Sequence, residues 1–329
     1  MIHVHGGSAL LEKLRAAMVP GEFLEWCDVL CQGPTPAGLA PDAWRATRAA
    51  FLRESGPALD GKDAALSLAA QDAALEGALS QDEMVLWFGP ELFCQAILLY
   101  LLNWLGQRRD ALPRRVSLVC VGEYPGVDDR RSCTPAFLSP DQLHDVFARR
   151  ETVGDEQFDL AREAWTAFTG ASPLAVADVA ATGTAALRYL APALRRHLEE
   201  LPATDTGLNR TERGILEALD ARDSDFSELQ SLCQEGEERR WLTDVILWDV
   251  LRRLAAGRAP LVSLPPDAAP AWPPPRGAPI RITPMGRDVL LGRRDWIAEN
   301  GIDRWVGGVH LERGNVWRWE REGGHVVPP

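Results

Sequence analysis

Lysine is almost absent from this chain of 329 residues. Lysine and arginine together number 35, of which only Lys13 and Lys62 are lysines, and the formal net charge is −12. Proteins that hold nucleic acids gain most of their affinity from basic surfaces that neutralise phosphates. The charge balance therefore argues against broad contact with DNA, RNA or anionic lipid.

Long apolar runs are also missing. The longest candidate, Ala96–Leu105, contains Asn103 and falls short of the roughly 18 residues that suggest a membrane span. The opening residues, Met1–His5, do not have the basic and apolar regions of a signal peptide. We therefore expect no membrane association and a cytoplasmic location.

Cysteine is sparse, with six residues in the chain, and only Cys27 and Cys31 lie close together. A zinc site would need two further ligands at similar spacing, which the sequence does not supply. We expect free thiols, as in a reducing compartment, and no metal site. No motif identifies a cofactor, so its identity stays unknown.

Residues 1–135 alternate between short apolar runs and helical patterns. The expected strands are Met1–His5, Glu22–Leu30, Met84–Phe88 and Val116–Val121. The expected helices are Ser8–Ala17, with Ser8 as N-cap, Asp42–Glu54, Ala64–Leu79 and Glu91–Leu105. Strands that alternate with helices are typical of a parallel sheet covered on both faces. The predicted fold class is a doubly wound α/β domain with a mainly parallel sheet.

Residues 136–203 are predicted to be a helical linker segment. One helix should begin with Ser139 as its N-cap and Pro140 at its first position. Asp155–Phe168 is amphipathic, and Ala185–Leu201 has leucines at helical spacing. Pro192 should kink or split that last helix.

Residues 204–329 have the element order of a winged-helix-like α+β domain. Three helices are expected, at Asn209–Leu219, Asp225–Gln234 and Leu242–Ala256. Two short strands, Pro260–Ser263 and Ile280–Thr283, can then pair across the proline-rich loop Pro265–Pro279. The alternating Val316–Trp319 stretch predicts a C-terminal β-hairpin.

The charges of this third part do not favour DNA recognition. Acids outnumber bases by 13 to 8 from Glu200 to Arg258. The third helix is dominated by apolar residues such as Ile246 and Trp248, whereas helices that contact base edges usually offer Arg, Lys, Asn or Gln. We expect this part to contact a protein partner or a second copy of the chain.

Six motifs spread over nearly the whole chain carry a resemblance. They are His3-x-x-x-Gly7, Trp26-x-Asp28-x-Leu30-x-x-Gly33-Pro34, Leu86-Trp87-Phe88 with Gln95, Pro192-Ala193-Leu194-x-Arg196-x-Leu198-Glu199, Gly207-Leu208-x-Arg210-Thr211-Glu212, and Asp303-Arg304-Trp305-x-Gly307-Gly308-Val309-His310. With these motifs the chain resembles the bacterial proteins of domain-of-unknown-function family 1835. The resemblance implies no activity, substrate or cofactor.

Candidate binding residues gather where the predicted strands end, because parallel sheets bind ligands at the carboxyl ends of their strands. The turn after the first strand offers glycines and free N–H groups at a helix start, which favour an anion, although a tight turn explains it equally well. Asp28 and Glu91 could orient a ligand or exchange protons, or could only stabilise a turn and a helix start. The predicted ligand-binding set is Gly6, Gly7, Ser8, Asp28, Glu91, Gln95, Arg45 and Arg48.

Three functional hypotheses follow. The first is a regulatory or interaction protein that holds a small anionic or polar ligand at these strand ends. The second is a hydrolase or transferase in which His5, Asp28 and Glu91 meet at the same cleft, and the third is a winged-helix DNA-binding regulator. Convergence of these three side chains on one pocket would favour the enzyme.

Overall fold

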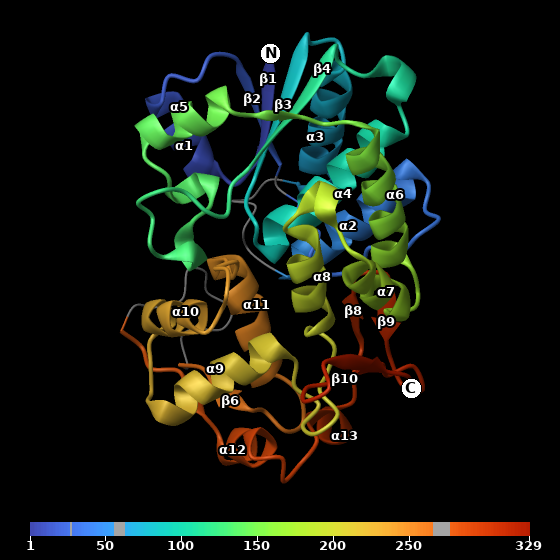
Figure 1. The fold of residues 1–329 in the computed structure, drawn as a ribbon. Helices are drawn as coiled ribbons and strands as arrows, with labels where there is room; N and C mark the ends of the chain where they lie inside the picture. The colour runs from blue at the N-terminus through green and yellow to red at the C-terminus, as the bar shows by residue number, and fades with distance from the viewer. Residues whose placement is uncertain (27, 56–62, 266–276) are drawn as a thin grey trace.

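The structure is a computed structural model that describes residues 1–26, 28–55, 63–265 and 277–329. It has a mixed α/β fold with a five-stranded, mostly parallel sheet, many helices and small antiparallel hairpins (Figure 1). The mainly parallel sheet expected from the sequence is therefore confirmed. Cys27 and most of the expected proline-rich loop, at 266–276, lie outside the described residues.

The sheet determines where a ligand can bind. Its strands are β1 (Ile2–Gly6), β2 (Glu22–Trp26), β3 (Glu83–Phe88), β4 (Arg115–Cys120) and β5 (Glu151–Thr152). They lie in the order β2-β1-β3-β4-β5, in which the first four are parallel and β5 is antiparallel to β4. Because β2 and β3 lie on opposite sides of β1, the connections after β1 and before β3 lead to opposite sides of the sheet, which makes the position between β1 and β3 a switch point. In open α/β sheets, such a switch point leaves a crevice at the carboxyl ends of the strands.

Helices cover both faces of this sheet and continue beyond it (Figure 1). Those of the first two thirds are α1 (Ser8–Ala16), α2 (Pro41–Ser55), α3 (Ala64–Ala78), α4 (Leu92–Gly106), α5 (Pro140–Ala148), α6 (Asp155–Thr169), α7 (Leu174–Thr182) and α8 (Leu190–Leu198). The last third adds α9 (Arg210–Ala221), α10 (Phe226–Glu235), α11 (Asp244–Ala255), α12 (Pro284–Leu290) and α13 (Trp296–Asn300). Figure 1 shows α10 and α11 below the end of the sheet toward which the strands run.

Three two-stranded antiparallel hairpins complete the C-terminal part. They pair β6 (Val262–Ser263) with β7 (Arg281–Ile282), β8 (Arg304–Val306) with β9 (Val309–Leu311), and β10 (Arg318–Glu320) with β11 (His325–Val327). The sequence predicted one final hairpin, and the structure has two, because Gly307 and Gly308 allow a tight turn between β8 and β9. Gly307 has a φ of 60°, a conformation that suits glycine.

Side-chain alternation explains how β1 separates the two layers of the core. Ile2 and Val4 join an apolar cluster with α4, whereas His3 and His5 point to the opposite face, where α1 and α5 pack. The first cluster continues without interruption through α6 and α8 to α9 and α11. One continuous apolar core thus connects the sheet to the C-terminal helices.

Some predicted boundaries were wrong for identifiable reasons. Ser8 is the first helical residue of α1 and not its N-cap, because Gly7, with a φ of 78°, occupies that position. The helix expected over Ala185–Leu201 is divided, as predicted, into a 3₁₀ turn at Ala185–Leu187 and α8. The break lies before Pro192, which occupies the first turn of α8, where its missing N–H has no helical partner to lose. The strand expected over Glu22–Leu30 ends at Trp26.

Candidate functional site

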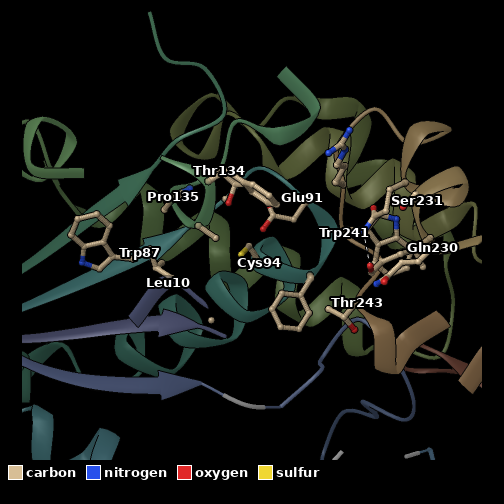
Figure 2. A pocket seen from close by; sticks show the side chains of 18 of the residues that line it. Leu10, Trp87, Glu91, Cys94, Thr134, Pro135, Gln230, Ser231, Trp241 and Thr243 are labelled. Atoms are coloured by element: carbon tan, nitrogen blue, oxygen red, sulfur yellow. Dashed lines mark hydrogen bonds between the residues drawn. The ribbon is translucent and has the colours of Figure 1, made fainter. Parts of the chain in front are cut away.

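A cavity of about 530 Å³ lies at the carboxyl ends of β1 and β3 (Figure 2). Gly6 at the end of β1, with Gly89 and Glu91 just after β3, forms its sheet side. Residues of α10 and of the loop that leads to α11 form the opposite side, including Gln230, Ser231, Gln234, Glu235, Arg240, Trp241, Leu242 and Thr243. The cavity therefore occupies the crevice at the switch point of the sheet and is closed by the C-terminal helices.

Glu91 is the buried acid of this cavity. It is 8% exposed, and its Oε2 has no hydrogen-bond partner among the described residues. The carboxyl group packs against Gly89, where an added Cβ would lie 2.0 Å from Oε2, so only glycine leaves room for it. Burial raises the pKa of Glu91, which the nearby Cys94 thiol and the charge of Arg239 lower by less.

The helical side of the cavity supplies three further unpaired groups, one of which is the buried Nε of Arg240. Trp241 is 4% exposed, and its indole Nε1 has no partner within the described part of the chain. The Gln234 side chain donates from Nε2 to the Leu242 carbonyl at 2.5 Å, which leaves its buried Oε1 unpaired. Figure 2 shows Trp241 across the cavity from Glu91 and Cys94. The two walls thus present both donors and acceptors to whatever enters.

A buried arginine of α8 holds the helical wall in place. Arg196 donates to both carboxylate oxygens of Glu237, to Glu200 at 2.7 Å and to the hydroxyl of Thr211 at 2.8 Å. Its guanidinium carbon lies 4.9 Å from the centre of the Trp241 ring, within the range of a cation–π contact. One side chain therefore fixes both ends of the segment from Glu237 to Trp241.

The same segment is also attached to the loop after β4. Arg239 donates from Nη1 to the Gly122 carbonyl at 2.7 Å, and the backbone N–H of Arg240 donates to the Arg131 carbonyl at 3.2 Å. Arg131 in turn donates to the Glu235 carbonyl at 3.0 Å. The segment before α11 is thus attached to the loop after β4 by both side-chain and main-chain hydrogen bonds.

Five of the predicted site residues lie at or next to the sheet side of this cavity. Gly6 and Glu91 line it, and Gly7 follows at the N-cap of α1. Gln95, one turn into α4, donates to the Gly89 carbonyl at 2.7 Å and supports the turn after β3. Ser8 begins α1.

Asp28, in contrast, lies in an ion pair away from this cavity. It is 2% exposed and accepts hydrogen bonds from Nε and Nη2 of Arg48, the latter at 2.6 Å. The remaining Arg48 donors reach the carbonyls of Val29, Gln32 and Pro34. The pair therefore organises the loop after β2. Arg45, also in the predicted ligand-binding set, is partly exposed and pairs with Asp42 and Asp72.

His5 also has a structural role. Its Nδ1 lies 3.2 Å from the Gly7 carbonyl, its Nε2 is unpaired among the described residues, and burial lowers its pKa to about 4. His5 is not among the residues that line the cavity at β1 and β3. The three side chains of the enzyme hypothesis therefore do not converge there, since only Glu91 faces that space.

Sequence reasoning did not select Trp241, Gln234 or Arg196 as site residues. They lie more than a hundred positions beyond Glu91 along the chain, and no local spacing connects them to it. An aromatic and charged segment between two predicted helices, Glu237–Trp241, was the available signal. Only the packing of α10 and α11 over the sheet gives that segment a role.

Comparisons with known proteins add no assignment. No family model matches the chain, and no curated protein matches its sequence. Within the described ranges, no cluster of three or more His, Cys, Asp or Glu side chains could hold a metal ion. No helix in the described parts of the chain has the length and apolar character needed to cross a membrane.

The Arg48–Asp28 pair yields a stability prediction. Arg48→Met should lower the free energy of unfolding by about 3–5 kcal/mol, because it leaves the Asp28 carboxylate buried without a partner. Arg45→Met, three residues earlier on the same helix, removes a partly exposed pair and should cost less than about 1 kcal/mol. Urea denaturation of both variants measures the difference. Equal losses would show that the buried pair does not hold the loop.

The buried carboxyl yields a prediction for pH. Because the folded pKa of Glu91 lies above its ordinary value of 4.5, this group lowers stability as the pH rises from that value through the folded pKa. Glu91→Gln removes this dependence. The melting temperature of the variant minus that of the wild type should therefore increase between pH 5 and pH 8. Glu235→Gln, an exposed acid on the other wall, serves as the control. A constant difference between variant and wild type at all pH values would contradict the burial of an ionisable Glu91.

Proposed function

We propose that the protein is a regulatory or interaction protein that binds a small polar ligand in the cavity at the ends of β1 and β3. The observation that carries this proposal is the buried, unpaired carboxyl oxygen of Glu91 at the switch point of the sheet. Buried polar groups in native proteins are nearly always paired, so an exception in a cavity points to a missing partner.

The lining favours a ligand with hydrogen-bond donors over an anion. The free acceptors are Glu91 Oε2 and Gln234 Oε1, and the free donors are Trp241 Nε1 and Arg240 Nε. The charge balance decides between the ligand classes, because the lining carries the acids Glu91 and Glu235 against the single base Arg240. Glu91 also occupies the N-cap position of α4, where a phosphate or carboxylate would otherwise benefit from the helix dipole. Of the anionic and polar ligands that the sequence suggested, we favour a neutral or cationic molecule that bears hydroxyl or amino groups.

Regulation would follow from the position of the ligand between two layers. A molecule that contacts both Glu91 and Trp241 stabilises the arrangement in which α10 and α11 cover the strand ends, and so shifts the protein toward it. We propose that residues 204–329, with α9–α11 followed by the β6–β7 hairpin, act as a winged-helix-like unit. This unit would transmit the liganded state to a protein partner or a second copy of the chain.

The two alternatives receive less support from the geometry. His5 and Asp28 are occupied by contacts within the fold, which leaves Glu91 without the partners that a hydrolase or transferase would use. The apolar side of α11 is buried, and Arg252 of this helix donates to the carbonyls of Glu54 and Ser55. A helix covered in this way does not offer its side chains to a DNA groove.

Two further predictions stay part of this proposal. Membership of domain-of-unknown-function family 1835 rests on the six sequence motifs. A cytoplasmic location is consistent with the five cysteines of the described ranges, Cys31, Cys94, Cys120, Cys133 and Cys233, which are free thiols.

The ligand site can be tested with a thermal-shift screen of nucleosides, amino sugars and polyamines beside phosphate esters. At least one donor-bearing compound should raise the melting temperature of the wild type, because a ligand at tenfold its Kd stabilises by about 1.4 kcal/mol. Gly89→Ala should abolish this shift, since its Cβ displaces the Glu91 carboxyl. Gly214→Ala in α9, where an added Cβ meets nothing within 4 Å, should retain it.

The proposal fails if no compound stabilises the wild type. It also fails if a stabilising compound shifts the Gly89→Ala and Glu91→Gln variants as strongly as the wild type, because the ligand would then bind elsewhere.

A further inference from the structure

A second cavity lies on the other side of the α/β part, between α2, α3, α4 and α6. It measures about 720 Å³ and shares no lining residue with the cavity at the strand ends. Four partly exposed aromatic side chains line it, namely Trp44, Tyr100, Trp104 and Trp165. The proposed ligand site at the strand ends does not involve these aromatic residues.

The rings of Trp44, Tyr100 and Trp165 form an aromatic corner, in which two rings are nearly parallel and the third is steeply tilted against both. The rings of Trp44 and Tyr100 are nearly parallel, at 10°, with centroids 6.2 Å apart. Trp165 is tilted by 64° from the first and 74° from the second, with centroid distances of 5.9 Å and 5.3 Å. Trp44, Trp104 and Trp165 make no hydrogen bond through their indole N–H groups within the described residues. The corner therefore combines flat apolar faces with unused donors.

A buried amide completes the lining. Asn103 of α4 is 7% exposed and lines this cavity, yet its side chain has no hydrogen-bond partner among the described residues. The other side chains on this stretch of α4 are largely apolar core residues. Because the amide lines the cavity and has no partner there, it is available to a ligand that enters.

The charges around the cavity pair with one another. Arg45 contacts Asp72 at 3.0 Å, and Arg108 contacts Glu76 at 3.1 Å while its guanidinium lies 3.8 Å from the centre of the Trp104 ring. Burial raises the pKa of Tyr100, so its hydroxyl stays protonated. The lining is thus polar but close to neutral, which disfavours a strongly charged ligand.

We propose that this cavity binds a neutral saccharide. Sugar rings present apolar C–H faces that stack on aromatic rings, and hydroxyl groups that pair with amides, hydroxyls, carboxylates and guanidinium groups. Aromatic walls, the unpaired amide of Asn103 and ion-paired charges at the rim match both requirements. A purely apolar ligand would leave the amide unpaired, and an anion would find Arg45 and Arg108 already paired with acids. The volume lies in the range of small-molecule sites.

Isothermal titration with maltotriose, cellotriose and tri-N-acetylchitotriose, at concentrations up to the order of 10 mM, tests the proposal. One of these trisaccharides should bind the wild type, whereas sorbitol, which has hydroxyls but no ring face, should not. Asn103→Leu should weaken that binding by about tenfold or more, because the sugar hydroxyls lose their buried partner.

The same variant separates a binding role from a structural one. If Asn103 serves a ligand and not the fold, Asn103→Leu should not lower the melting temperature of the unliganded protein, since it removes no hydrogen bond within the described residues. Trp44→Leu should also weaken binding and provides the test if Asn103→Leu does not fold. Gly214→Ala in α9 is the control with unchanged affinity.

Either of two results would overturn the proposal. One is the absence of binding by any of the trisaccharides to the wild type. The other is wild-type affinity in the variants, with a lowered melting temperature for Asn103→Leu, which would make the amide a structural group.

Discussion

The pairing of Arg196 with Glu237 and Glu200 is the interaction on which the rest of the candidate site depends. It brings the charge of α8 into contact with α9 and with the segment before α11, in a region that excludes water. A guanidinium with unpaired donors would be costly there, so the three elements must meet in one arrangement. That arrangement sets the position of Trp241 and therefore the width of the cavity.

The opposite wall depends on strand order and on one missing side chain. The switch in strand order between β1 and β3 opens the crevice, and Gly89 lets the Glu91 carboxyl occupy its edge. The surrounding core gives this acid little solvent, and its Oε2 has no hydrogen-bond partner among the described residues. Such local costs are typical of functional positions.

The sequence predicted the elements whose patterns are local. Period-two and helical spacing located β1, β3 and α4 to within two residues, and the strand-end rule selected Gly6 and Glu91. It could not predict that Arg48 turns inward to Asp28 while Arg45 stays at the surface, because both lie on one helix and only the loop after β2 distinguishes them. Trp241 and Asn103 gain their roles from contacts between distant segments, which no spacing along the chain encodes.

The continuity of the apolar core has a consequence for how the protein can be dissected. Leucines and tryptophans of α9 and α11 belong to the same buried cluster as Val4 and Leu86 of the sheet. A fragment that stopped near residue 203 would expose the surface that these helices now cover, and would aggregate more readily than a self-contained domain. The chain should accordingly be expressed whole, and its halves are expected to melt together as a single cooperative unit.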